Sequence, residues 1–502
     1  MLRFKRRNKN LIQGEVLSMI KSIQHFQEVG VKNLEEVMVN YSGDMTKIAE
    51  MVYGVTENVV KLGLSMIEEE LENYDNHLRN NKVCRKGWHI VKIDETTLLT
   101  SLGNVTYKKT LFKNKNTGER EYLLDRAMGI EKHARMTEDA HAKILEEAVE
   151  SSYRKGGQNA SIGNEEVSKE TVMNKVHALK FPKATPQKEK KALQYLYIDA
   201  DEDHVALQYL DKKGDIKKPR NNTIMPKIVY VYEGIEHDGT RNKLINKKHF
   251  GGVYEGSAGV EALWNEVYEY IEASYEIEEI EKIYISGDGA GWIKSGAKII
   301  EQAKFVLDRF HLHKYIVGAT SHLLDSVSDA REEIYSSIYK KKKYRLEQVF
   351  DKILDVTESE SKRKTVEAAK VYISGNWPGI MEKVRSKDRQ LKCSAEGAVS
   401  HVYASRMSSR PLGWSRTGAD KMSRLRIYYY NKGNMLELVR YQKEELPKVA
   451  GGEDMAYSCG EMRIMENKAR REVGMYADMP THSIPYTQVK KIANLKNNIW
   501  GL

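Results

Sequence analysis

The sequence predicts an α/β protein. Beyond residue 193, short apolar runs typical of buried strands alternate with longer stretches of helical periodicity. The 502 residues suffice for three or four domains at roughly 100–200 residues each. Hydrophobic residues make up 40% of the chain, which is enough to fill several cores.

Composition limits the classes of protein that this chain can represent. Lys and Arg exceed Asp and Glu by 81 to 71, a net charge of +10, and the pI is near 9.0. This balance fits either a polyanion partner or a solvated surface of mixed charge. The sequence contains no run of 18 apolar residues, so we expect no membrane-spanning helix. Cys84, Cys393 and Cys459 form no CxxC pair, and the basic N-terminus has no apolar core behind it, so we expect a cytoplasmic protein.

The N-terminal 180 residues are expected to form helices and one small sheet. Region 1–80 has helical spacing and suits a bundled segment that could mediate oligomerisation. Region 81–180 combines a small antiparallel sheet with helices that follow it. Ser168 is placed to cap one of these helices, which fits the DNA-reading helix of a helix-turn-helix or an ordinary capped amphipathic helix. The residues that would contact DNA are Lys169, Thr171, Asn174 and Lys175.

A Pro- and Lys-rich linker at 181–192 precedes the α/β part. Its first segment, 193–313, is expected to contain strands at 193–199, 205–210, 227–233, 282–286 and 304–307, and helices at 262–271 and 292–302. A charged helical insertion is expected at 314–390, a second core segment at 391–440, and a tail with little pattern at 441–502.

Three acidic residues stand out by their context. Asp201 follows one predicted strand, Asp288 ends another, and Glu396 lies near the start of a helix. Carboxylates at the ends of adjacent strands can converge, and such a group suits one or two magnesium ions that act on a phosphodiester. The alternative is a solvated turn at Asp201 and a glycine-flanked loop residue at Asp288.

Asp308 and His311 form a second candidate pair, one helical turn apart after a short apolar strand. They suit an accessory catalytic role, or else a capping Asp with surface histidines. His313 points to a different face of the helix, so joint metal binding with His311 is not expected.

The stretch 400–416 is cationic and rich in hydroxyl groups. Arginine and serine side chains are natural phosphate ligands, and a tryptophan can stack on a base. The candidates are Arg406, Arg410, Trp414 and Arg416. A surface helix and loop would explain the same composition.

These motifs together resemble a known family. Segments 197–208, 285–294, 306–315, 393–401 and 408–415 look like the ISLre-two family of bacterial insertion-sequence transposases, long described as an uncharacterised protein family and related to the Mutator-like DDE transposases. The resemblance runs from about residue 80 to about residue 440. It implies an RNase H-like mixed-sheet core interrupted by an all-α insertion and preceded by helical and small α+β DNA-binding regions.

The resemblance also implies a site and a reaction. Asp201, Asp288 and Glu396 carry over as ligands of magnesium, or manganese in its place, with two ions per site. Asp203 is a second candidate for the first ligand, and the Asp308/His311 pair resembles a feature of the Mutator-like relatives. Ala398 stands where the family commonly has a histidine.

The implied partners are double-stranded DNA, as terminal inverted repeats and target, and a second copy in a homodimer or larger oligomer. A cytoplasmic, nucleoid-associated location and no membrane contact follow. The alternatives are an inactive or domesticated DNA-binding protein, and a metal-dependent nuclease without strand transfer.

Overall fold

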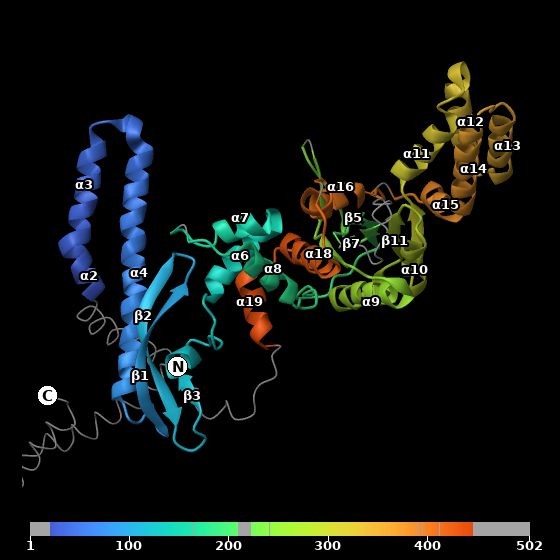
Figure 1. Cartoon of the computed structure of the whole chain (residues 1–502). Helices are drawn as coiled ribbons and strands as arrows, with labels where there is room; N and C mark the ends of the chain where they lie inside the picture. The colour runs from blue at the N-terminus through green and yellow to red at the C-terminus, as the bar shows by residue number, and fades with distance from the viewer. Residues whose placement is uncertain are drawn as a thin grey trace, which may run out of the picture. The chain divides into compact units, whose positions relative to one another are not determined.

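The computed structural model describes residues 21–163, 165–208, 222–239, 241–388, 390–393, 395–410 and 412–444 (Figure 1). The expectations for residues 1–20 and for the tail beyond 444 lie outside these ranges. The chain divides into two units, the first with residues up to Thr137 and the second spanning Glu138–Glu444. In the part of the chain that the structure describes, no helix is long and apolar enough to cross a membrane.

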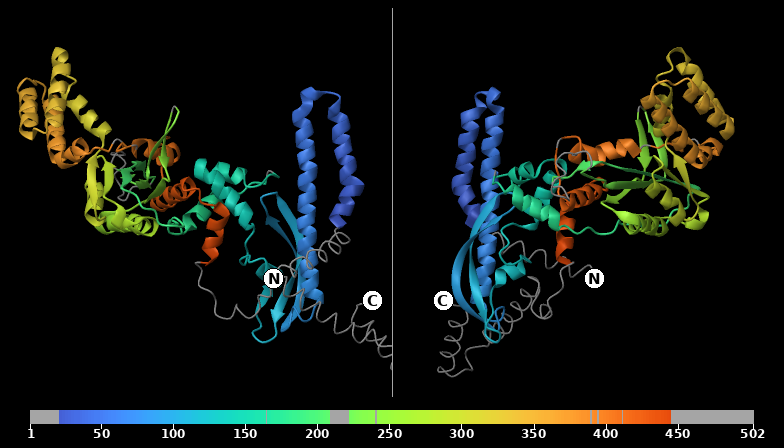
Figure 2. Two further views of the ribbon diagram at one scale, coloured as in Figure 1. Left: turned by 180° about the vertical axis from the view of Figure 1, so that it is seen from behind. Right: turned by 45° about the vertical axis from the view of Figure 1, so that its right-hand side comes forward.

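The first unit joins a helical hairpin to a small sheet. Its helices are α2 (Lys21–His25), η1 (Phe26–Gly30), α3 (Val31–Ser42), η2 (Met45–Lys47), α4 (Ile48–Asn80) and α5 (Leu123–Ala127). The antiparallel sheet consists of β1 (Trp88–Leu99), β2 (Asn104–Asn114) and β3 (Arg120–Tyr122). Helix α3 lies beside one half of α4, and the sheet packs on the other half (Figures 1 and 2).

One buried carboxylate ties the long helix to this sheet. Asp75 of α4 accepts hydrogen bonds from the backbone N–H of Thr110 at 2.9 Å and from its hydroxyl at 2.6 Å. Around this contact, apolar residues of α4, β1 and β2 form the core of the unit. They include Leu78, Trp88, Val105, Tyr107 and Phe112.

The second unit is built on a mixed five-stranded sheet. Its strands, in chain order, are β4 (Tyr195–Glu202), β7 (Lys227–Tyr232), β10 (Lys248–Gly252), β11 (Lys282–Gly287) and β12 (Ala303–Leu307). Their spatial order is β10-β7-β4-β11-β12, which is 3-2-1-4-5 in chain order. Strands β4, β11 and β12 are parallel, whereas β7 is antiparallel to both of its neighbours.

Two details of the strand prediction were wrong. Of the expected strand 205–210, the structure describes residues 205–208, and among these only Val205–Ala206 form a strand, β5, which pairs with β6 (Thr223–Ile224) outside the main sheet. The hairpin β8 (Gly234–Asp238) and β9 (Arg241–Ile245), and the edge strand β10, were not predicted. These strands are short and mostly polar or glycine-rich, so no apolar run marks them.

Helices cover the apolar face of the sheet. Helices α9 (Gly256–Ser274) and α10 (Gly291–Ile299) pack on Leu196, Ile198 and the other apolar residues that alternate along the strands. Trp264 is fully buried there, and its indole N–H donates to the carbonyl of Trp292 at 2.8 Å.

The insertion between β12 and the last core segment is helical. It comprises α11 (Arg309–Thr320), η6 (Leu324–Ser326), α12 (Val327–Tyr339), α13 (Lys343–Asp355), α14 (Glu360–Gly375) and α15 (Trp377–Arg385). These helices share their own apolar core and form one bundle, of which α15 packs on β12 (Figures 1 and 2).

Helices from both ends of the second unit complete it. The N-terminal ones are α6 (Glu138–Glu150), α7 (Tyr153–Gln158) and α8 (Lys169–Ala178), and the C-terminal ones are α16 (Ala395–Val399), η7 (Ser400–Ala404), α17 (Ser405–Met407), α18 (Arg416–Tyr430) and α19 (Met435–Glu444). The fully buried Arg426 of α18 donates to the carbonyls of Val149 and Val402 and, at 2.8 Å, of His401. Helices α6–α8 therefore belong with this unit and not, as the sequence suggested, with the small sheet.

Candidate active site

Three aspartates lie at the carboxyl ends of three neighbouring parallel strands. Asp201 is the penultimate residue of β4, Asp288 follows β11 directly, and Asp308 follows β12 directly. The backbone N–H of Asp308 donates to the carbonyl of Gly287 at 2.9 Å, which joins the ends of β11 and β12. Because parallel strands end at the same edge of a sheet, this topology brings the acids together.

Asp201 carries a perturbed carboxyl group. Burial, helped by the charge of Asp288, raises its pKa to about 6, although the backbone N–H of Glu202, which donates to it at 2.8 Å, acts in the opposite direction. A carboxylate that is costly to ionise beside another carboxylate is typical of a site that receives a cation or a proton.

The loop that carries Asp288 is held on both sides. The Asp288 carboxylate accepts from the backbone N–H of Ala290 at 2.8 Å, and its carbonyl accepts from the hydroxyl of Tyr372 in α14. Gly289 has a φ of +91°, which favours glycine, and a Cβ on Gly287 would lie 2.8 Å from the carbonyl oxygen of Ala200. The Gly-Asp-Gly sequence is therefore required by the tight turn.

The pair Asp308 and His311 faces the same site. Asp308 caps α11 by accepting from the Phe310 N–H at 3.1 Å, and the Nδ1–H of His311 donates to its other oxygen at 3.0 Å. This hydrogen bond raises the pKa of His311, and the charges of Asp201 and Asp288 add to the effect. His311 therefore lies within electrostatic reach of both carboxylates.

The structure places the helix of Glu396 against β4, whereas its side chain lies outside what the structure describes. The flanking segment is anchored to the polar face of the sheet by three tyrosine hydroxyls. Tyr197 donates to Asp388 at 2.6 Å, Tyr232 to the carbonyl of Lys392 at 2.8 Å, and Tyr403 to the carbonyl of Lys227 at 3.0 Å. The π-helix η7, a rare form often found at functional sites, follows directly.

Asp203 is engaged elsewhere. It is buried, and the hydroxyl of Ser408 donates to both of its carboxylate oxygens, at 2.9 and 2.8 Å. It holds the loop that follows α17, so Asp201 remains the better candidate for the first ligand.

Among the described side chains, no group of three or more His, Cys, Asp or Glu residues is arranged to hold a metal ion. The described donors that fit a hard cation are the carboxylates of Asp201 and Asp288, with Glu396 outside this test. His313 bonds instead to the hydroxyl of Tyr335 at 2.7 Å, so it faces away from His311.

The predicted DNA contacts divide into exposed and buried residues. Ser168 caps α8 as expected, and Lys169 and Asn174 are exposed, with Thr171 and Lys175 partly so. The connection from α7 to α8 spans residues 159–168, longer than the three or four residues of a helix-turn-helix.

Two of the four residues expected to contact DNA beyond residue 400 are buried instead. Arg406 is 8% exposed, donates to the Ala148 carbonyl at 3.3 Å and lies over the ring of Trp414, which is 6% exposed. The prediction for these two was wrong, because both pack against α6 and α7. Arg410 is exposed, and Arg416 is exposed and paired with Glu255 at 2.9 Å.

Sequence reasoning missed the polar lining behind the acids. Asp199, fully buried on β4, accepts from the hydroxyl of Tyr230 at 2.8 Å, and Tyr197 stacks on Tyr232. The alternation of Tyr195, Tyr197, Asp199 and Asp201 is the pattern that marks this face.

The comparisons with known proteins match most of the chain. Residues 42–445 match the Uncharacterised protein family (UPF0236). A UPF0236 protein of Caldanaerobacter subterraneus subsp. tengcongensis is 38% identical over 420 residues, covering 82% of this chain and 85% of the relative. The UPF0236 protein in the vanSb 3′ region of Streptococcus gallolyticus is 23% identical over 365 residues, covering 70% and 76%.

Among solved structures, the Drosophila P element transposase strand transfer complex is similar with a TM-score of 0.22 and 11% sequence identity. The match covers 62% of this chain and 82% of that chain. A similarity this low supports no functional argument.

Proposed function

This chain belongs to the uncharacterised protein family UPF0236, and we propose that it is a DDE-type DNA transposase of a bacterial insertion sequence. The observation that carries the proposal is the meeting of Asp201, Asp288, Asp308 and His311 at the carboxyl ends of adjacent parallel strands. Carboxylates at neighbouring strand ends, among them Asp201 with its raised pKa, are typical of phosphoryl-transfer sites.

The sheet supports an RNase H-like core. Its order of 3-2-1-4-5, with the second strand antiparallel to its neighbours, is the arrangement of strands in RNase H-like folds. The helical insertion, α11–α15, precedes the helix of Glu396, as the resemblance implies.

In this proposal Asp201, Asp288 and Glu396 would hold magnesium, or manganese in its place, as two ions. The ions would activate the attacking oxygen and neutralise charge on the phosphodiester. The sheet fixes the positions of Asp201 and Asp288, the Tyr372 contact steadies the Asp288 loop, and His311, oriented by Asp308, is placed to move a proton. The same residues serve cleavage at the element end and the later attack of its 3′-hydroxyl on target DNA.

Binding of terminal inverted repeats and target DNA would rest on exposed basic groups. Lys169, Asn174, Arg410 and Arg416 remain candidates, with Thr171 and Lys175 beside them on α8. Phosphate contacts of this kind make affinity fall steeply with salt concentration. A nucleoid-associated, cytoplasmic protein is the corresponding expectation in the cell.

Joining two element ends requires at least a dimer, and we assign the contact to the α3–α4 hairpin. Ile48, Val52, Val59 and Met66 of α4 are exposed and, with Val55 and Leu62, follow the alternating four- and three-residue spacing of a coiled-coil seam. The flanking positions, including Ala49, Thr56, Asn58, Gly63 and Ser65, carry no charge that would repel a second copy. A Val59→Glu variant should shift the mass seen by light scattering toward monomer, whereas Glu57→Gln, on the outer face, should not. Equal masses for both variants would reject this interface.

The test of the activity is magnesium-dependent cleavage and joining of DNA that carries the element ends. We expect the wild type to be active and Asp288→Asn to lose at least about 10³-fold in rate while binding the same DNA. Asp351→Asn, the same change on the insertion helix α13, is the matched control and should retain activity. Specific binding without cleavage under any divalent ion would favour an inactive DNA-binding protein. Cleavage without joining would favour a nuclease. Activity that survives in Asp288→Asn would mean that the active site lies elsewhere.

A further inference from the structure

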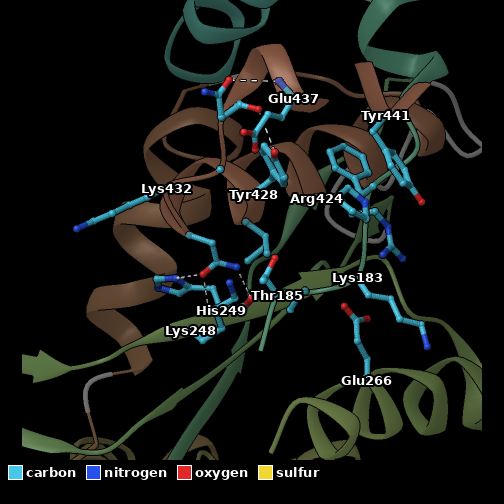
Figure 3. Close-up of a pocket in the computed structure, with 18 of the residues that line it drawn as sticks. Lys183, Thr185, Lys248, His249, Glu266, Arg424, Tyr428, Lys432, Glu437 and Tyr441 are labelled. Carbon is cyan, nitrogen blue, oxygen red and sulfur yellow. Dashed lines mark hydrogen bonds between the residues drawn. The ribbon is translucent and has the colours of Figure 1, made fainter. Parts of the chain in front are cut away.

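A cavity of about 620 Å³ lies along the free edge of β10, away from the carboxylates (Figure 3). It is bounded by the segment 181–185, by Glu266 of α9, and by residues of α18, α19 and the turn between them. Its volume falls within the range of small-ligand sites.

Polar groups of the edge strand open into this cavity. The side chain of Asn431 covers part of the edge, since its oxygen accepts from the His249 N–H and its amide donates to the His249 carbonyl, both at 2.8 Å. Alternate residues of a strand direct their backbone groups to the same edge, so the N–H of Gly251 faces the cavity as well. The edge therefore offers a hydrogen-bond donor beside the point that Asn431 covers.

Basic side chains outnumber acidic ones in the lining of this cavity, with Lys183, Lys248, Arg424, Lys432 and Arg440 against Glu266 and Glu437. Lys183, Arg424 and Arg440 are paired with Glu269, Asp420 and Glu138. Lys248 is half buried, burial lowers its pKa, and neither it nor the exposed Lys432 has an acidic partner among the described residues. A half-buried ammonium without a counter-ion is costly unless an anion binds beside it.

We propose that this edge cavity binds a phosphate of a nucleic-acid backbone. Lys248, Lys432 and the Gly251 N–H supply donors for the phosphate oxygens, and the rings of Tyr428 and Tyr441 line the same cavity, where a base could stack. The proposal rests on the transposase function for its choice of nucleic acid.

The register of the sheet gives the distance to the active site. Lys248 pairs with Val231, which pairs with Ile198, three residues before Asp201. Lys248 therefore lies about 10 Å across and about 10 Å along the sheet from Asp201, by standard strand spacings. Lys248 shares the face of Phe250, opposite to that of Asp201, so a strand that occupies the active site would reach the cavity by passing over the β10 edge.

Lysine footprinting of the full chain tests this proposal. The protein would carry Asp288→Asn so that DNA stays intact, and amine-reactive labelling of Lys248 would be followed by mass spectrometry with element-end DNA, with a mononucleotide, or with inorganic phosphate. We expect DNA to reduce labelling of Lys248 at least threefold. The proposal is wrong if labelling of Lys248 is unchanged at saturating DNA, or if Lys248 does not react in the free protein. It is also wrong if the mononucleotide or inorganic phosphate protects Lys248 and DNA does not.

Substitutions supply the second arm. The double variant Lys248→Gln/Lys432→Gln should weaken DNA binding and reduce the slope of log affinity against log salt by roughly 1 to 2, since each phosphate contact contributes about 0.9. Lys362→Gln/Lys364→Gln, at two exposed positions of α14, is the control that removes the same two charges. An unchanged slope with an unchanged melting temperature would contradict the site. If the wild type does not cleave DNA but DNA still protects Lys248 from labelling, the proposed catalysis is rejected and the DNA-binding site is retained.

Discussion

The two faces of the five-stranded sheet carry side chains of different polarity, although they share one backbone. On β4, Leu196, Ile198 and Ala200 point to a dry core under α9 and α10, whereas Tyr197, Asp199 and Asp201 point to a face of phenols and carboxylates. Strand alternation separates the two environments by a single residue. One face therefore packs in the apolar core, and the other carries the acids of the proposed active site.

A comparison along the polar face is equally informative. Asp199 is fully buried and accepts from the hydroxyls of Tyr230 at 2.8 Å and Tyr232 at 3.4 Å, so its carboxylate serves structure. Asp201, two residues further on, has a pKa raised to about 6 by burial. The proposed metal ligand is therefore the carboxylate at the end of the strand, beyond the tyrosines.

The apolar face should give the largest effect on stability. Trp264→Ala removes a fully buried indole and leaves a cavity, so we expect the free energy of unfolding to fall by about 3–5 kcal/mol. Urea unfolding measures it, with Trp377→Ala in the insertion as a control for tryptophan loss. A loss under 1 kcal/mol would mean that the apolar face does not hold the sheet.

Asp201→Asn should stabilise the protein while abolishing activity. The folded pKa of Asp201, about 6, lies above its ordinary value of 3.8, so the folded state binds the proton more tightly and stability falls as pH rises from about 4 to 6. The neutral side chain should therefore add about 1–2 kcal/mol at pH 7.5 and nothing at pH 4. Thermal unfolding at both pH values decides, and a gain that is the same at both would contradict the electrostatic cause.

His249 should give the smallest effect, with the opposite dependence on pH. Burial, and then the charge of Lys247, lowers its pKa to about 3, so the folded state resists its protonation and stability falls as pH drops below 6.5. His249→Gln loses ring packing at neutral pH, but its deficit against wild type should shrink by roughly 1 kcal/mol between pH 7 and 5.5. Urea unfolding at the two pH values measures this, and a constant deficit would show that His249 is protonated normally.

The sequence predicted the parts whose signals are local. The strands β4, β7, β11 and β12 each contain a short run rich in apolar and aromatic residues, and the turn chemistry of Gly287-Asp288-Gly289 marks a strand end. Strand β10, Lys-His-Phe-Gly-Gly, has one large apolar residue, and its pairing with β7 has no local signal in the sequence. The burial of Arg406 depends on the carbonyl of Ala148, 258 residues away, which no local pattern reveals.

The order in which the chain is synthesised gives Arg426 a further consequence. The Val149 carbonyl that it satisfies is made 277 residues earlier, and a ribosome adding about 5 to 20 residues per second needs about 14 to 55 s to span that interval. During that interval helix α6 lacks its hydrogen-bond partner Arg426. A chain that ends before residue 426 would therefore lack the contact between Arg426 and the Val149 carbonyl. We expect such a truncated protein to be degraded by proteases.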